Sequence, residues 1–207
     1  MIRKEKLEEL EKYINELKTI KVEPKKIKQE KKWIQSEVNN YYLNNGEIIP
    51  REKLIKGKND GSAVIIMPVL KNKEILTIIE PRVFTELTVG IGFPAGYIEN
   101  LEKPIKSAER ELLEETGYKA EKMIELDTFY QDEGCSSALN HVFLALNVEQ
   151  KEEQKLDESE IIKYMTFTYE ELKELEKLNY IKGVNSKMAL LKYKEVIKWI
   201  QKKKQKK

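Results

Sequence analysis

Apolar residues recur every three or four positions near the start of the chain, which is the spacing of one helix face. The pattern predicts a helix over residues 5–20. It is carried by Leu7, Leu10, Ile14 and Leu17. Because so short a helix is not stable alone in water, we expect this face to pack on the rest of the chain or on a second subunit. A separate partner protein is the alternative.

A second stretch of helical spacing follows Pro24 and ends at the "NNGEIIP" of residues 44–50. Its apolar positions are Ile27, Ile34, Val38 and Tyr41, with Trp33 beside them. Together the two patterns predict an N-terminal helical extension over residues 1–45, ahead of a catalytic domain over residues 46–207.

From residue 62 the pattern changes to short runs rich in β-branched residues, which predict strands. The expected strands are residues 62–70, 74–82, 123–131, 138–148 and 160–167. Helical patterns at residues 104–116, 168–178 and 186–204 are interspersed with them. Pro104 fits the first turn of the first of these helices and Gly117 its end, while Thr168 is a plausible N-cap of the second. Strands and helices mixed in this way indicate an α/β sandwich.

The composition removes several classes of function. The net charge of +2 gives no electrostatic case for nucleic acid, and no apolar run is long enough to span a membrane. Cys135 is the only cysteine and His141 the only histidine, which excludes an internal disulfide and a zinc site built on these residue types. A cytoplasmic location is the simplest expectation.

The helix predicted at residues 104–116 carries an unusual number of carboxylates. Glu111, Glu114 and Glu115 stand at positions i, i+3 and i+4, so their side chains share one face. Like charges placed in this way repel, unless a hard divalent cation such as Mg²⁺ lies among them. A solvated acidic surface is the alternative interpretation of these three residues alone.

The residues around these glutamates resemble the Nudix box, the loop–helix–loop signature of hydrolases that cleave nucleoside diphosphates linked to another group. The pattern is G-x₅-E-x₇-R-E-L-x-E-E-x-G, with Tyr118 after it in place of the usual aliphatic residue. It is formed by Gly96, Glu102, Arg110, Glu111, Leu112, Glu114, Glu115 and Gly117. The resemblance implies a Nudix-type α/β/α sandwich with a mixed sheet.

The resemblance also implies roles for individual residues. Glu111 and Glu115 match the family's main ligands for Mg²⁺ or Mn²⁺, with Glu114 and the carbonyl of Ala95 as further ligands. Glu102 and Arg110 match the pair that holds the loop and the helix together, and Gly96 and Gly117 match the structural glycines of the box. The metal ions would neutralise a pyrophosphate and position or activate a water molecule.

Residues 80–99, "EPRVFTELTVGIGFPAGYIE", resemble the segment before the box in ADP-ribose pyrophosphatases. Arg82 falls at the arginine of that segment and is a candidate for binding a phosphate of the substrate; a surface salt bridge is the alternative. Glu133 stands where these enzymes usually have a proline, and it is a second candidate for contact with the substrate. Gly92 stands where they often have a glutamate. Related pyrophosphatases are dimers, so a homodimer is expected.

The acidic stretch "LDESE" at residues 156–160 resembles the loop that supplies a catalytic glutamate in this subfamily. We expect Glu158 to act as the general base, with Glu160 as the second choice. A solvated acidic turn is the alternative.

The function favoured by these features is a metal-dependent pyrophosphohydrolase that acts on ADP-ribose or a nucleotide sugar. Three alternatives stay open: a Nudix-fold module that senses a nucleotide without cleaving it, a pyrophosphatase for dinucleotides, and an enzyme that removes oxidised nucleoside triphosphates.

Overall fold

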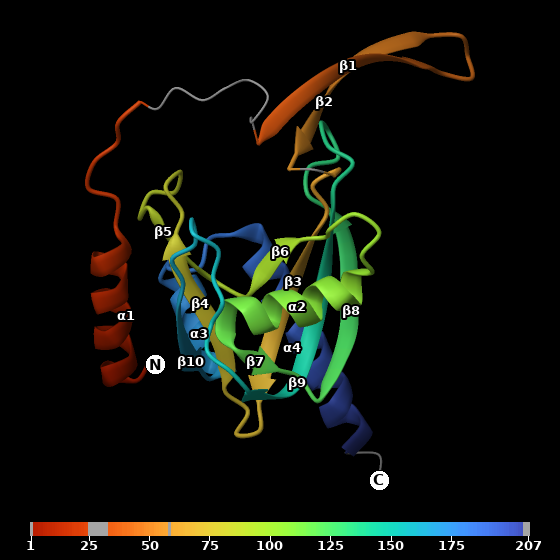
Figure 1. Cartoon of the computed structure of the whole chain (residues 1–207). Helices are drawn as coiled ribbons and strands as arrows, with labels where there is room; N and C mark the ends of the chain where they lie inside the picture. The colour runs from red at the N-terminus through yellow and green to blue at the C-terminus, as the bar shows by residue number, and fades with distance from the viewer. Residues whose placement is uncertain (1, 25–32, 58, 205–207) are drawn as a thin grey trace.

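The computed structural model describes residues 2–24, 33–57 and 59–204 (Figure 1). Its helices are α1 Lys4–Leu17, α2 Pro104–Thr116, α3 Tyr169–Lys177 and α4 Val184–Lys204. Its strands are β1 Ile34–Tyr42, β2 Ile48–Lys56, β3 Ala63–Leu70, β4 Ile75–Pro81, β5 Val89–Gly92, β6 Ala95–Tyr97, β7 Tyr118–Lys119, β8 Lys122–Tyr130, β9 Leu139–Gln150 and β10 Lys163–Phe167. None of the helices within these ranges is long and apolar enough to cross a membrane.

A mixed sheet forms the centre of the molecule. Its main path runs β10-β4-β3-β9-β7, and the remaining strands join as pairs of β5 with β4, β6 with β3 and β8 with β9. Strands β3 and β9 run parallel, whereas the other paired strands are antiparallel. This confirms the predicted mixed sheet.

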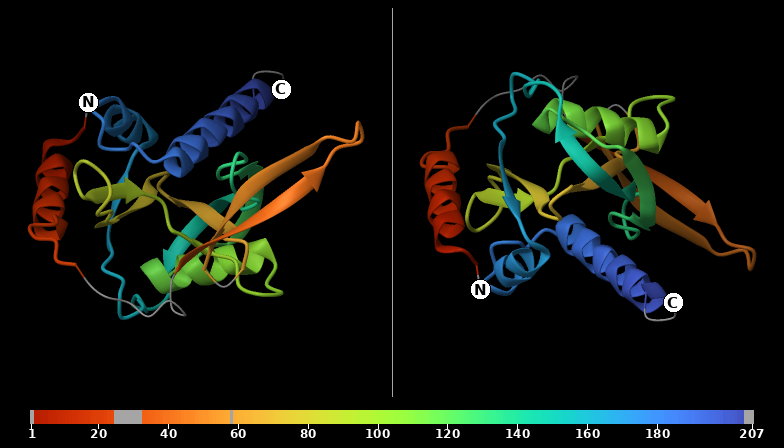
Figure 2. Two further views of the ribbon diagram at one scale, coloured as in Figure 1. Left: turned by 90° about the horizontal axis from the view of Figure 1, so that it is seen from above. Right: turned by 90° about the horizontal axis from the view of Figure 1, so that it is seen from below.

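Helices cover both faces of this sheet, because buried strands present apolar side chains alternately to either side. In β3, Ile65 and Met67 contribute to a core shared with α1, α3 and α4, whereas Val64 and Ile66 pack against Ala108 and Leu112 of α2. Figures 1 and 2 show α2 on one side of the sheet and α4 on the other. The predicted α/β/α sandwich is therefore confirmed.

The expected helix boundaries in the catalytic domain follow from local chemistry. Helix α2 has Pro104 in its first turn and ends at Gly117, whose φ of 76° is a left-handed conformation that favours glycine. Helix α3 is capped as expected by Thr168, whose side chain accepts from the backbone N–H of Glu171, while the Glu171 carboxylate accepts from the N–H of Thr168.

Helix α1 confirms the first N-terminal pattern, and its apolar face packs on its own chain. Leu10 and Leu17 are buried in the core that also holds α3 and α4. Just before the helix, Arg3 places its Nε 2.7 Å from one oxygen of Glu171 and its Nη2 2.7 Å from Glu74. These charge-assisted bonds fasten the start of α1 to the domain.

The second predicted N-terminal helix is wrong where the structure describes it. Residues 34–42 form β1, which pairs with β2 in a separate two-stranded antiparallel sheet, while Ile27 lies outside the described residues. The physical reason is that Ile34 and Val38, two positions of the predicted pattern, are separated by four residues, a spacing that fits one face of a strand as well as one face of a helix, whereas Tyr41 falls on the other face of the strand. Asn45 and Gly46 make the intervening turn, and the domain boundary after residue 45 stays a prediction.

The anchor of α1 gives a stability prediction. Burial alone would raise the pKa of Glu171, but hydrogen bonds from Arg3 and from the N–H of Thr168 lower it to about 2. Ionised Glu171 therefore stabilises the fold fully above its ordinary pKa of 4.5, and this contribution is lost as the pH falls toward 2. Glu171→Gln should cost about 1–3 kcal/mol at pH 7, measured by urea unfolding.

The matched control is Glu170→Gln, because Glu170 is exposed on the same turn of α3. We expect the free energy of unfolding of the control to stay within about 0.5 kcal/mol of the wild type. The loss of stability caused by Glu171→Gln should become smaller as the pH falls from 5 to 3. Equal stability of the two variants at pH 7 would show that Arg3 and Glu171 do not anchor α1.

Candidate active site

The glutamates of α2 lie against the short strand β6, which crosses close to the helix. The exposed fraction of the side chain is 12% for Glu111 and 43% for Glu114, and Glu115 is buried. The approach is close because residue 96 is glycine: a Cβ there would lie 2.0 Å from Cδ of Glu111. A side chain at this position would displace the Glu111 carboxylate from its place beside the loop.

Arg110 holds the loop and the helix together. Its guanidinium lies 2.9 Å from Glu102 in the loop, and 2.7 Å and 3.1 Å from Glu111 and Glu114 on the helix. It also donates to the carbonyl of Tyr97. The hydrogen bond from Arg110 lowers the pKa of Glu102, so this carboxylate stays charged. The structure thus brings Glu102 and Arg110 together as the Nudix resemblance implies.

Negative charge accumulates beside this pair. Burial raises the pKa of Glu111 to about 6, against the opposing effect of Arg110. Burial raises the pKa of Glu115 as well, and the nearby charges of Glu80 and Glu111 add to the effect. Among the described residues, the hydrogen bond that favours ionised Glu115 comes from the backbone N–H of Ala95, 3.0 Å from its Oε2. A divalent cation would supply the positive charge that this cluster lacks.

The donor set suits a hard cation, since it consists of carboxylates and a backbone carbonyl next to Gly96. Within the described part of the chain, no three acidic, histidine or cysteine side chains already form a group of metal ligands. Arg110 draws Glu111 and Glu114 toward itself, whereas Glu115 turns to Ala95. Glu111, Glu115 and the Ala95 carbonyl would hold Mg²⁺ or Mn²⁺ once Glu111 turns from Arg110.

Glu80 is a member of the cluster that the sequence prediction missed. It stands at the end of β4, and burial raises its pKa although Arg82 lies 2.5 Å away and opposes the shift. Its signal in the sequence is a carboxylate that directly follows the apolar run "ILTII". The structure places Arg82 beside the cluster, with a side chain that is 55% exposed and paired with Glu80.

The acidic loop between β9 and β10 also reaches the cluster. Its Gln154 donates to the carbonyl of Glu115, and the N–H of Lys155 donates to that of Glu114 at 2.8 Å. Burial is the main cause of the raised pKa of Glu80, Glu111 and Glu115, and the charge of Glu160 adds to it at all three. Glu158 and Glu160 are both exposed in this turn.

Two other residues singled out in the sequence lie elsewhere. Glu133 is exposed on the turn between β8 and β9, where the neighbouring Cys135 carbonyl accepts from the N–H of Leu54 in β2. His141 lies on β9, with Nδ1 2.8 Å from Glu125 of β8. Contact of Glu133 with the substrate stays a prediction.

A sandwich whose carboxylate-bearing helix is joined to a glycine loop through Arg110 is the arrangement that the Nudix resemblance implies. The model of the family described as NUDIX domain matches residues 60–185, more than half of the chain. The chain therefore belongs to the NUDIX family of hydrolases.

The chain is also similar to individual proteins of known name. The chain is 36% identical over 135 residues to an ADP-ribose pyrophosphatase of Bacillus subtilis (strain 168), covering 65% of this chain and 70% of the relative. It is 32% identical over 150 residues to a methanol dehydrogenase activator of Bacillus methanolicus, covering 72% and 76%. It is 35% identical over 120 residues to an ADP-sugar pyrophosphatase of Mus musculus, covering 55% of each chain.

Among solved structures, the chain is similar to an ADP compounds hydrolase with a TM-score of 0.69. The similarity covers 88% of this chain and 95% of the other at 22% identity, and it bears on the fold alone.

Removal of one negative charge from the carboxylate cluster should impair hydrolysis. Glu115→Gln should lower the rate of diphosphate hydrolysis by about 10²-fold or more at saturating Mg²⁺, because a charged ligand is lost while the side chain keeps its shape. Glu109→Gln is the matched control, since Glu109 lies on the same helix but pairs with Lys106 at the surface. Wild-type turnover in Glu115→Gln, with circular dichroism unchanged, would refute the assignment of the cluster as the metal site.

Proposed function

We propose that the protein is a metal-dependent pyrophosphohydrolase that cleaves the diphosphate of ADP-ribose or of a nucleotide sugar, giving a nucleoside monophosphate and a sugar phosphate. The observation that carries the proposal is the carboxylate cluster of α2 beside Gly96, in which Glu115 is buried and Glu111 largely so. The ADP-ribose and ADP-sugar pyrophosphatases among its relatives support the substrate class.

Family hydrolases generally require a divalent metal ion, and Glu111, Glu115 and the Ala95 carbonyl would hold Mg²⁺ or Mn²⁺, with Glu114 as a further ligand. When bound, the ion offsets the charge of the diphosphate and makes a water molecule more acidic. Arg110 positions Glu114, and it holds Glu111 only until that carboxylate turns to the ion. Arg82 lies at the surface and can exchange Glu80 for a phosphate oxygen.

In the proposed reaction, the oxygen of a water molecule attacks one phosphorus atom and the bond from that phosphorus to the bridging oxygen breaks. Glu160 accepts the proton of the attacking water. We favour Glu160 over Glu158, the first choice from the sequence, because the charge of Glu160 acts on Glu80, Glu111 and Glu115. The Glu160 carboxylate also accepts from the N–H of Asp157 at 3.0 Å, which orients it within the turn.

A panel of ADP-ribose, nucleotide sugars, NADH and diadenosine polyphosphates with Mg²⁺ or Mn²⁺ tests the proposal by product chromatography. The proposal requires cleavage of ADP-ribose or a nucleotide sugar at the diphosphate. Preference for the dinucleotides would favour the dinucleotide alternative, and binding without cleavage of any member would favour a sensing module.

The general base is tested in the acidic loop. Glu160→Gln should reduce kcat by about 10²–10⁴-fold with little change in KM, whereas Glu158→Gln should reduce it far less. Glu153→Gln, a change at an exposed position of the same loop, is the control. If Glu160→Gln keeps more than about half of the wild-type kcat, the proton must go elsewhere and the metal ions alone activate the water.

We also propose a homodimer, working in the cytoplasm without nucleic acid or membrane. The resemblance to dimeric pyrophosphatases supports it, and so does one face of β1, where Ile34, Val38 and Tyr42 are 57%, 69% and 74% exposed. Light scattering at micromolar concentration should give twice the chain mass of 24.4 kDa. Val38→Lys should yield a monomer, and Asn39→Lys on the opposite face should not. A monomeric wild type would contradict the homodimer.

A further inference from the structure

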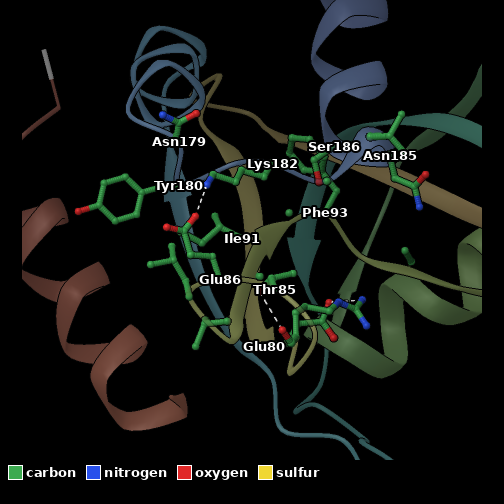
Figure 3. A pocket seen from close by; sticks show the side chains of 18 of the residues that line it. Glu80, Thr85, Glu86, Ile91, Phe93, Asn179, Tyr180, Lys182, Asn185 and Ser186 are labelled. Atoms are coloured by element: carbon green, nitrogen blue, oxygen red, sulfur yellow. Dashed lines mark hydrogen bonds and ion pairs between the residues drawn. The ribbon is translucent and has the colours of Figure 1, made fainter. Parts of the chain in front are cut away.

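The acidic loop, residues 151–162 between β9 and β10, carries Glu160 and contacts the end of α2. A pocket of about 290 Å³ adjoins the carboxylate cluster, since Glu80 and Ala95 are part of its lining (Figure 3). None of residues 151–162, all of which the structure describes, lines this pocket. The walls of the pocket therefore do not determine where the acidic loop lies, and its position has to come from its contacts with α2.

The loop supplies hydrogen-bond donors to the carboxyl end of α2. The last carbonyl groups of a helix have no partner within the helix and must find donors elsewhere. In α2, the carbonyl of Glu114 accepts from the backbone N–H of Lys155 at 2.8 Å, and the carbonyl of Glu115 accepts from Nε2 of Gln154. The loop is thus fastened to the helix end that carries two of the proposed metal ligands.

The start of the loop is fixed at Gly117, the residue that ends α2. The carbonyl of Gly117 accepts from the N–H of Lys151 at 2.8 Å and from that of Glu152 at 3.2 Å. A Cβ at residue 117 would lie 2.1 Å from the carbonyl oxygen of Glu152, so glycine is what allows the loop to come this close.

Gln154 makes a second contact at the far end of the loop. Its Nε2 also donates to the carbonyl of Ile162 at 3.4 Å, and Ile162 is buried directly before β10. A primary amide nitrogen carries two N–H groups, so Gln154 can serve both carbonyls at once. One side chain therefore joins the end of α2 to both ends of residues 155–161, the segment that carries Glu160.

Between these fixed ends, residues 157–160 form a turn that is closed on itself. The N–H of Glu160 donates to the carbonyl of Asp157 at 2.9 Å, and the N–H of Asp157 donates to the Glu160 carboxylate at 3.0 Å. Among the described residues, no hydrogen bond joins this turn to α2. The place of Glu160 relative to the metal ligands therefore depends on how the two ends of the loop are held.

We propose that Gln154 is a positioning residue, which keeps Glu160 in place for proton transfer by joining the end of α2 to both ends of the acidic loop. The proposal rests on the proposed function, in which Glu160 accepts the proton of the attacking water. A general base must lie within hydrogen-bond reach of the proton that it takes, and a displacement of about 1 Å can cost about 10²-fold in rate.

Gln154→Met tests the proposal, because methionine has nearly the same length but no donor. We expect kcat for diphosphate hydrolysis to fall by about tenfold or more, while KM and the affinity for Mn²⁺ stay within about twofold of the wild type. Gln154→Glu, which keeps the shape of the side chain and also lacks the donors, should lose at least as much. Gln150→Met is the matched control, since the Gln150 amide is exposed and donates to Glu152 and Tyr164.

A double variant separates positioning from a merely structural role. In the Glu160→Gln background, Gln154→Met should change kcat by less than about twofold, because no base is left to position. A purely structural residue would lower kcat by the same factor in both backgrounds.

Amide hydrogen exchange, followed by NMR, examines the loop without catalysis. The N–H of Lys155 is bonded to α2 next to Gln154, so its exchange in the full chain should become about fivefold faster or more in Gln154→Met. It should not change in Gln150→Met.

Wild-type kcat in Gln154→Met, unchanged exchange of the Lys155 N–H, or an equal loss of kcat with and without Glu160 would each overturn the proposal. A parallel fall in Mn²⁺ affinity would overturn it too, because Gln154 would then act on the metal ligands. A wild type that hydrolyses a diphosphate while Gln154→Met keeps its kcat refutes only the positioning role. A wild type that hydrolyses none refutes the proposed function, and the exchange measurement then decides alone whether Gln154 holds the loop.

Discussion

The proposed site depends on the ion pairs that Arg110 makes with Glu102 in the loop and with Glu111 and Glu114 on α2. Glu111, Glu114 and Glu115 share one helix face, where like charges destabilise a helix. Arg110 offsets part of this repulsion and joins the helix to Glu102 in the loop. The close contact between Gly96 and Glu111 then brings the Ala95 backbone beside the carboxylates. Without these ion pairs, the loop and the helix would have no charged link within the described residues of the box.

Segments that are distant in sequence meet at the carboxylate cluster of α2. Strand β4 ends there with Glu80, β6 passes beside α2, and the acidic loop is hydrogen-bonded to the carboxyl end of α2 through Gln154 and Lys155. The α3–α4 turn completes the adjoining pocket. The mixed sheet is the common scaffold, because β3 pairs with both β9 and β6 while β4 pairs with both β10 and β5.

The sequence predicted the parts of this arrangement that depend on local chemistry. Pro104, Gly117 and the spacing of the glutamates define α2 without knowledge of the rest of the fold. Glu80 was missed because its role depends on burial next to Glu115, a residue 35 positions further along the chain. The helix predicted around Val38 was wrong because a spacing of four residues fits both a helix and a strand, and only pairing with β2 decides between them.

The most direct test of the central claim, that the α2 cluster binds a divalent cation, is calorimetric titration of the protein with Mn²⁺ in two buffers of different ionisation enthalpy at pH 6. The pKa of Glu111 is raised to about 6, so roughly half of the protein molecules carry a protonated Glu111 at this pH. The account predicts Mn²⁺ binding accompanied by proton release, because a carboxylate must be deprotonated to act as a ligand. Absence of binding, or binding with equal heat in both buffers, would contradict it.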